Sequence, residues 1–370
     1  MTPRYVFKSQ KFESIKLPSI EEKRGKEWVD FGSNNLYPQL LIELFNNSAM
    51  HHTAVEAIVD GITGEGFKYF GEEVINSFGE TMNEVFAKIA LDYKLFGGYS
   101  LNVIWARDGE TIAEIYHLPF NGVRSGLMND DEKIEEYWYC SNWAKYRKNK
   151  PKSYPAYSTT NNQDENSSQI FYYFDYTVGQ FYYPLPNYVG AINDIDTDAR
   201  ISRFHANNLK NGLAPSMMLT FKNGIPTPDE QASIWKDIEE TFAGEENAGQ
   251  FFVNFAEPGR EPTLQPIENA NDDYYITLES RITSRILTSH KITSPLLLGI
   301  KDASGFSNNA DEIEVAFAHF MGTVIRPDQK KLVKSFNKLI NQTGKTVKLE
   351  IEPAKILDTV DVNGSDQQIQ

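Results

Sequence analysis

The stretch Pro186-Asn-Tyr-Val-Gly-Ala-Ile-Asn-Asp-Ile-Asp-Thr-Asp-Ala-Arg-Ile-Ser-Arg-Phe-His-Ala-Asn-Asn-Leu-Lys-Asn211 decides the fold. Its apolar residues recur every three or four positions, the spacing of one helix face, at Tyr188, Ile192, Ile195 and Ala199. Gly212 then stands where helices commonly end. The pattern predicts a helix over 186–211, roughly 35 to 40 Å long at the usual rise per residue.

A second stretch, Asp272–Ile292, predicts another long helix, with three apolar residues in register: Leu278, Ile282 and Ile286. Between the two helices the sequence shows strand, helix and strand patterns in turn, over Met217–Phe221, Pro228–Phe242 and Gly249–Phe255. The two long helices therefore bracket a small α+β insertion.

Before residue 186 the patterns change from helix to strand. Helices are predicted over Pro38–Phe45 and Ser48–Ile62 and through Val85, Ile89 and Tyr93. Strands are predicted over Tyr99–Ala106, Thr111–His117, Ile134–Trp143 and Ile170–Tyr176. The Lys, Pro, Ser and Asn-rich stretch 145–168 is predicted to be a mobile surface loop.

After residue 292 a Gly, Ser and Asn-rich loop precedes a helix containing Ile313, Phe317, Phe320 and Val324. Pro327 is expected to interrupt that helix, and a last helix carries Leu332, Phe336 and Leu339. Lys345–Ile351 alternates like a strand, and the acidic tail from Asp358 is expected to fray.

Composition narrows the class of protein. The 370 residues are 40% apolar and 13% aromatic, enough for a large core divided among two or three structural units. A formal charge of −15 argues against gripping nucleic acid through its phosphates, and the one cysteine, Cys140, excludes an internal disulfide. No apolar run approaches the roughly 20 residues of a membrane span, and residues 1–16 lack the features of a signal peptide, so a cytosolic protein is expected.

The sequence contains few candidates for metal-binding or catalytic motifs. Asp194-Ile-Asp196-Thr-Asp198 resembles the opening of a calcium loop, but Ala199 and His205 occupy the positions that need glycine and glutamate. The acidic residues are therefore expected to favour the start of a helix. No phosphate-binding loop, nucleophile elbow or zinc-binding helix motif is present. We predict no catalytic residue, no metal and no cofactor, which favours a structural or assembly role.

Several phrases, in their order along the chain, resemble the portal family of tailed bacteriophages. Trp28-Val-Asp-Phe-Gly-Ser-Asn-Asn-Leu-Tyr-Pro38 resembles the G-x-x-N-x-Y-P motif of that family, and Tyr93–Ser100 resembles the start of one of its strands. Further similarity lies at Asn207–Pro215, Asn247–Val253, Ile292–Gly299 and the Ser307-Asn308-Asn309 helix start. The best match runs from about residue 185 to residue 340.

The resemblance implies an α+β portal fold, usually assembled as a dodecameric ring around a DNA channel. It would place the wing in 1–185, the first stem helix in 186–212, the clip in 213–271 and the second stem helix in 272–294. The tunnel loop and further wing helices would fall in 295–345, and a reduced C-terminal crown in 346–370. Twelve such chains would carry about −180 in formal charge, which should repel phosphate and let DNA slide.

The same resemblance implies roles for three sets of residues. The tunnel loop facing DNA would be Lys301, Asp302, Ala303, Ser304, Gly305, Phe306, Ser307, Asn308 and Asn309. Clip docking to the motor or adaptor would use Pro226, Thr227, Pro228, Asp229, Glu257, Pro258, Gly259 and Arg260. Stem packing would use the apolar stripes, Tyr188, Ile192, Ile195, Leu278, Ile282 and Ile286.

A member of this family is expected at the portal vertex of the virion, after assembly in the bacterial host cytoplasm. The implied partners are copies of itself, the terminase large subunit, the major capsid and scaffolding proteins, head–tail adaptor or neck proteins, and double-stranded DNA, with no membrane. Two alternatives stay open: another head–tail connector ring component, or a metal-dependent nuclease.

Overall fold

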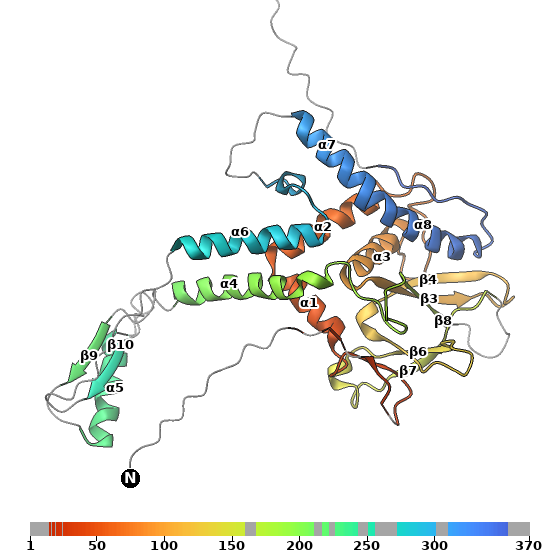
Figure 1. Cartoon of the computed structure of the whole chain (residues 1–370). Helices are drawn as coiled ribbons and strands as arrows, with labels where there is room; N and C mark the ends of the chain where they lie inside the picture. Colours follow the sequence, from red (N-terminus) through yellow and green to blue (C-terminus); the bar gives the residue numbers. More distant parts are fainter. Residues whose placement is uncertain are drawn as a thin grey trace, which may run out of the picture. The chain divides into compact units, whose positions relative to one another are not determined.

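A computed structural model of the chain describes residues 15, 17, 18, 20–23, 25–159, 168–210, 217–221, 226–242, 251–255, 272–300 and 310–353 (Figure 1). The chain divides into two compact units. One unit comprises Met1–Ile195 together with Ser284–Gln370, and the other comprises Asp196–Thr283. The mixture of helices and sheets confirms the predicted α+β class.

Three N-terminal helices occur in the first unit, and the sequence supplies a capping side chain for the second and the third. They are α1 (Tyr37–Asn47), α2 (Ala49–Thr63) and α3 (Met82–Phe96). The Ser48 hydroxyl accepts the His51 N–H at the start of α2, and Thr81 forms a reciprocal capping box with Glu84 at the start of α3. Gly97, in the left-handed region at φ 86°, ends α3.

Two antiparallel three-stranded sheets follow these helices. The first has the order β4-β3-β8, built from β3 (Gly98–Trp105), β4 (Ile112–Leu118) and β8 (Ser168–Phe174). The second has the order β5-β6-β7, built from β5 (Val123–Ser125), β6 (Glu136–Tyr139) and β7 (Lys152–Pro155). A two-stranded pair joins β1 (Ile20–Glu21) to β2 (Asp30–Phe31).

Two predictions about this region differ from the structure where it is described. The stretch 145–168 was expected to be a loop, but β7 lies within it and pairs with β6, with Tyr139 opposite Lys152. The β6 strand is in turn shorter than the predicted Ile134–Trp143, because the chain turns at Cys140 before the 3₁₀ turn Trp143–Lys145. Pairing between distant residues decided this region, and composition alone does not reveal such pairing.

The main core lies between the β4-β3-β8 sheet and the helices α2, α3 and α8 (Arg326–Asn341). Alternate residues of β3 enter it, as expected for a strand with one face on a core: Tyr99, Leu101, Val103 and Trp105. Opposite them α3 contributes Val85, Phe86 and Ile89, and α8 contributes Leu332, Phe336 and Leu339. Val85 and Ile89 of α3 and all three of these α8 residues are therefore core residues that the sequence predicts, whereas Phe86 was not predicted.

The C-terminal helices differ from prediction at Pro327. Helix α7 (Ala310–Phe320) continues through the π-helical turn Met321–Ile325 directly into α8. Pro327 lies in the first turn of α8, and the widened turn before it accommodates the missing N–H, so the chain stays helical. The predicted strand Lys345–Ile351 was also wrong, because only one bridge, Phe67 to Ile351, forms there.

The second unit contains β9 (Met217–Phe221), α5 (Pro228–Phe242) and β10 (Phe251–Phe255), and its two strands pair in parallel. These elements confirm the predicted insertion, and β9 and α5 have the predicted bounds. They are flanked along the chain by α4 (Ile192–Lys210) and α6 (Asp272–Ser289), each of which contributes residues to both units.

Both long helices are shorter than predicted. A 3₁₀ turn at Val189–Ala191 precedes α4, which therefore begins at Ile192 and is about 28 Å long. Helix α6 ends at Ser289, because Lys291 turns the chain at φ 58°. Within the described part of the chain, no helix is long and apolar enough to cross a bilayer.

Candidate functional site

The candidate site is the helix junction, where in the first unit the start of α4 meets the end of α6. Nη1 of Arg285 donates to Oδ1 of Asp194 across a distance of 3.0 Å. Beside this ion pair, Ile192, Ile195 and Ile286 are buried. The contact joins the first turn of α4 to the last turns of α6, so the two helices enter and leave this unit at one place.

The predicted apolar stripes are largely buried. Tyr188, Ile192, Ile195 and Ile286 are buried in the first unit, and Ile282 is buried in the second. Leu278 is half-buried. The periodicity therefore identified the buried face of each helix, while the stem role of these residues stays a prediction.

A buried pair of histidines lies behind the junction. Nδ1 of His51, on α2, lies 2.9 Å from Nε2 of His290, which directly follows α6. The Tyr188 ring packs against both imidazoles, at 4.4 and 5.2 Å between ring centroids, and its hydroxyl donates to the Leu95 carbonyl at 2.6 Å. The hydrogen bond requires one ring to donate and the other to accept, so α2 is fixed to the end of α6.

Burial keeps both imidazoles uncharged. Desolvation, with a smaller contribution from His52, lowers the pKa of His51 to about 3. Desolvation followed by the charges of His51 and Lys94 lowers the pKa of His290 well below its ordinary value. Nε2 of His51 is buried and has no hydrogen-bond partner among the described residues, so a second proton on that ring would be poorly solvated.

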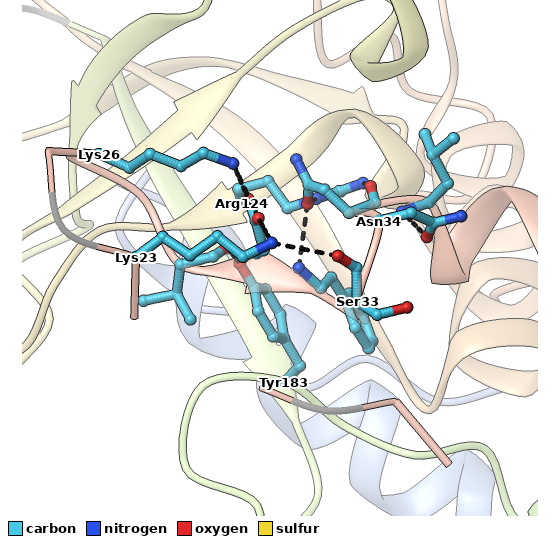
Figure 2. A network of polar contacts seen from close by, with 11 residues as sticks. Lys23, Lys26, Ser33, Asn34, Arg124 and Tyr183 are labelled. Carbon is cyan, nitrogen blue, oxygen red and sulfur yellow. Dashed lines mark hydrogen bonds and ion pairs between the residues drawn. The ribbon is translucent and has the colours of Figure 1, made fainter. Parts of the chain in front are cut away.

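The turn Gly32–Pro38, which carries part of the family resemblance, is fixed by a buried polar network (Figure 2). Gly32 and Asn35 both adopt left-handed conformations, at φ 85° and 62°. The Asn35 side-chain oxygen accepts from the Phe31 N–H at 2.9 Å and from Nε of Arg124 at 2.5 Å. The motif therefore shapes the backbone that leads into α1.

Arg124 is the centre of that network and is fully buried. Its guanidinium donates to three backbone carbonyls, those of Asn35, Asn121 and Val123, and lies 4.9 Å from the Trp143 ring. Desolvation lowers the pKa of Arg124 to about 10. Among the described residues no carboxylate bonds to it, so carbonyl dipoles and the aromatic ring stabilise the cation.

The predicted clip residues are described only in part. Pro226 and Thr227 directly precede α5, and Pro228 and Asp229 begin it. The Thr227 N–H and hydroxyl both donate to the Glu230 carboxylate at 2.8 Å. These bonds lower the pKa of Glu230. Glu257, Pro258, Gly259 and Arg260 lie outside the described residues.

The predicted tunnel loop, Lys301–Asn309, also lies outside the described residues. Its flanks are described and belong to the first unit. On one side a 3₁₀ turn, Pro295–Leu298, ends at Gly299 in the left-handed region at φ 74°, and on the other side α7 begins at Ala310. A loop at this place would therefore start from and return to ordered segments of the same unit.

The described residues provide no assembled site for metal chemistry. No group of three or more His, Cys, Asp or Glu side chains there could hold a metal ion. Asp194 binds Arg285 and Asp196 binds Arg200, so the calcium-like motif is occupied by ion pairs. An open pocket of about 580 Å³ contains Ser153, whose hydroxyl donates to Glu136, but no histidine lines it.

Sequence reasoning missed the interactions that join distant segments. The His51–His290 pair and the buried Lys94–Asp328 ion pair each connect residues more than 200 positions apart. No local spacing links such residues, and Lys94 and Asp328 each stand alone within an ordinary helical pattern.

Comparison with known proteins shows the fold. Solved structures described as the virion of a native gene transfer agent particle and as the neck of that particle computed with C12 symmetry each contain a similar chain. Each of these chains has 17% sequence identity to this one and a TM-score of 0.55. The match to the virion chain covers 88% of this chain and 86% of that one. The match to the neck chain covers 87% of this chain and 84% of that one.

A crystal structure described as an HK97-family phage portal protein from Corynebacterium diphtheriae covers 86% of this chain and 97% of its own, at 12% identity and a TM-score of 0.46. That score is too low to add to the fold assignment. No family model and no curated protein matches the sequence. The chain therefore has a fold also found in the neck of gene transfer agent particles.

Proposed function

We propose that this chain is a phage portal protein, the subunit of a ring at one capsid vertex through which DNA is packaged and ejected. The observation that carries the proposal is the fold shared with chains of gene transfer agent particles over 87% to 88% of this sequence. The ordered series of portal-like phrases in the sequence supports it independently. The chain then acts by assembly rather than by catalysis.

The arrangement along the chain supports a division into wing, stem and clip. Helices α4 and α6 flank β9, α5 and β10 in the sequence, as stem helices flank a clip in the portal family. The first unit would be the wing, and the buried stripes of α4 and α6 would pack the stem.

The partners follow from this role. Copies of the chain would form the ring, and the neck chain solved with C12 symmetry supports twelve of them. The clip, including Pro226–Asp229, would dock first the terminase large subunit and then the head–tail adaptor proteins. Capsid and scaffolding proteins would surround the ring in the virion, after assembly in the cytoplasm of a bacterial host.

The oligomeric state of the purified full-length chain tests the proposal. We expect a closed ring of twelve 42.1-kDa subunits, about 505 kDa, with a central channel in electron micrographs. A stable monomer at micromolar concentration would overturn the portal role. A ring whose image shows no separate stem and clip would instead favour another head–tail connector component.

The role of the tunnel loop can be tested separately. Replacing Lys301–Asn309 by nine Gly and Ser residues keeps the length of the segment, so the ring is expected to assemble as before. Packaging or retention of DNA is expected to fall, because the lining of the channel has changed. The measurement is the DNA content of purified particles, with the ring checked by electron microscopy; a variant that no longer forms rings would refute the assignment of this loop to the channel.

A further inference from the structure

One surface of the first unit is strongly basic although the chain is acidic. Five cations occur within eight residues, at Lys145, Arg147, Lys148, Lys150 and Lys152, and no acidic residue occurs from 137 to 163. We name residues 145–152 the basic segment. All five of its cations are exposed. None forms an ion pair with any residue that the structure describes.

The backbone of the basic segment is well anchored. Trp143, two residues before it, is 2% exposed, and its indole N–H donates to the Gly122 carbonyl at 2.8 Å. Within the segment the N–H groups of Lys148 and Asn149 donate to the Lys145 carbonyl. At its end Lys152 pairs with Tyr139 of β6. The cations are therefore presented from an ordered frame.

The start of the segment is also hollowed. Residues Ala144–Lys148 line an open pocket of about 410 Å³, three of whose five lining residues are cations. Tyr146 is half-buried there and its ring packs against Trp28, 5.7 Å away between ring centroids. A concave cationic surface beside an ordered aromatic ring suits a phosphate group next to its sugar.

We propose that the basic segment binds the sugar–phosphate backbone of double-stranded DNA without regard to base sequence. Lysines supply four of the five cations, and lysine is depleted in protein interfaces, which instead have an apolar centre. No large apolar residue is exposed between 144 and 152 to provide such a centre. Phosphate neutralisation, by contrast, requires clustered Lys and Arg and little else.

The acidic surface of the rest of the chain limits where DNA could bind. A net charge of −15 predicts that most of the surface repels DNA, and the surface outside this segment is more acidic still. DNA would therefore contact the chain at one place rather than along its whole surface. Binding by the purified chain does not depend on the portal role, so this inference can fail while the proposed function stands.

Fluorescence anisotropy of a labelled 30-base-pair duplex, titrated with the full-length chain, tests the proposal. Five phosphate contacts predict a slope near −4.5 for log affinity against log salt, or about 500-fold weaker binding at 200 mM than at 50 mM salt. The triple variant Lys145→Gln, Arg147→Gln, Lys148→Gln should bind about tenfold or more weakly at 50 mM salt and have a slope near −1.8.

The matched control removes the same charge elsewhere. Arg326, Lys330 and Lys334 are exposed at four-residue spacing on α8, and Arg326→Gln, Lys330→Gln, Lys334→Gln should leave binding within about twofold of wild type. Equal loss in both triple variants would show that net charge alone governs binding, and would overturn the proposal. Three other results would also overturn the proposal. They are unchanged binding by the basic-segment variant, no binding by wild type at 50 mM salt, and tighter binding of poly-glutamate than of DNA. Circular dichroism and gel filtration check that all three proteins are folded and equally assembled.

Discussion

Replacing Lys94 by methionine is expected to lower the free energy of unfolding by about 3 to 5 kcal/mol, because the substitution leaves a buried carboxylate without its cation. Nζ of Lys94, on α3, lies 2.9 Å from Oδ2 of Asp328, on α8. Only 6% and 11% of the two side chains are exposed. Urea unfolding of the full-length chain measures the loss.

Two control variants show whether the loss of stability comes from the buried charge. Lys331 and Asp175 form a similar ion pair at the surface, with 47% and 33% of the side chains exposed, so Lys331→Met should cost at most about 1 kcal/mol. The double variant Lys94→Met, Asp328→Leu removes both buried charges and should recover most of the lost stability. A loss below about 1 kcal/mol for Lys94→Met alone would mean that water reaches Asp328 and that α3 and α8 are not joined in this way.

Local sequence signals predicted the insertion in the second unit most accurately. Met217–Phe221 and Pro228–Phe242 have the predicted bounds as β9 and α5. Proline at the start of α5 and a short apolar run in β9 mark these elements without help from distant residues. The helices α2 and α3 were predicted for the same reason, since Ser48 and Gly97 mark one end of each.

The errors arose where distant residues or an unusual turn decided the structure. Strand β7 forms in a Lys-rich stretch because β6 pairs with it, and composition favours a loop there. Pro327 normally predicts a break, yet the π-helical turn before it keeps the chain helical. Residues 345–349 alternate like a strand but form none, and only the end of the segment bonds to another backbone, where the Lys68 N–H donates to the Glu350 carbonyl.

Local spacing predicted the buried residues of the candidate site but not their partners. The helical spacing of Ile192, Ile195 and Ile286 was enough to identify buried faces, because burial on a helix follows periodicity. The partners of those faces could not be predicted. His51 and His290 are 239 residues apart, and only the fold brings them into contact. The tunnel-loop and clip roles depend on the family resemblance and remain predictions.

The buried histidine pair at the helix junction predicts a loss of stability in mild acid. Below pH 6.5 the unfolded chain binds protons on His51 and His290 that the folded chain does not bind, because burial lowers both pKa values. The free energy of unfolding should therefore fall as the pH falls from about 6.5 towards 3, and these groups should have no effect above pH 7. With a pKa of about 3, His51 alone accounts for about 2 kcal/mol between pH 6.5 and 4.5.

The double variant His51→Gln, His290→Gln isolates this contribution, since glutamine is polar, similar in size and does not titrate. Carboxylates with lowered pKa values, such as Asp30 and Asp175, also lose stabilising interactions in acid, but they do so equally in both proteins. Wild type should therefore lose at least about 2 kcal/mol more than the variant between pH 6.5 and 4.5, in urea unfolding at each pH.

Ile58→Val serves as a control for a general loss of stability. Ile58 is fully buried on α2, so its truncation should cost about 1 kcal/mol at every pH without changing the pH dependence. Parallel curves for wild type and the double glutamine variant would mean that the imidazoles gain protons in the folded state as readily as in the unfolded state. The contact between α2 and the end of α6 would then open in acid without unfolding the chain, and the junction would be a hinge rather than a fixed joint.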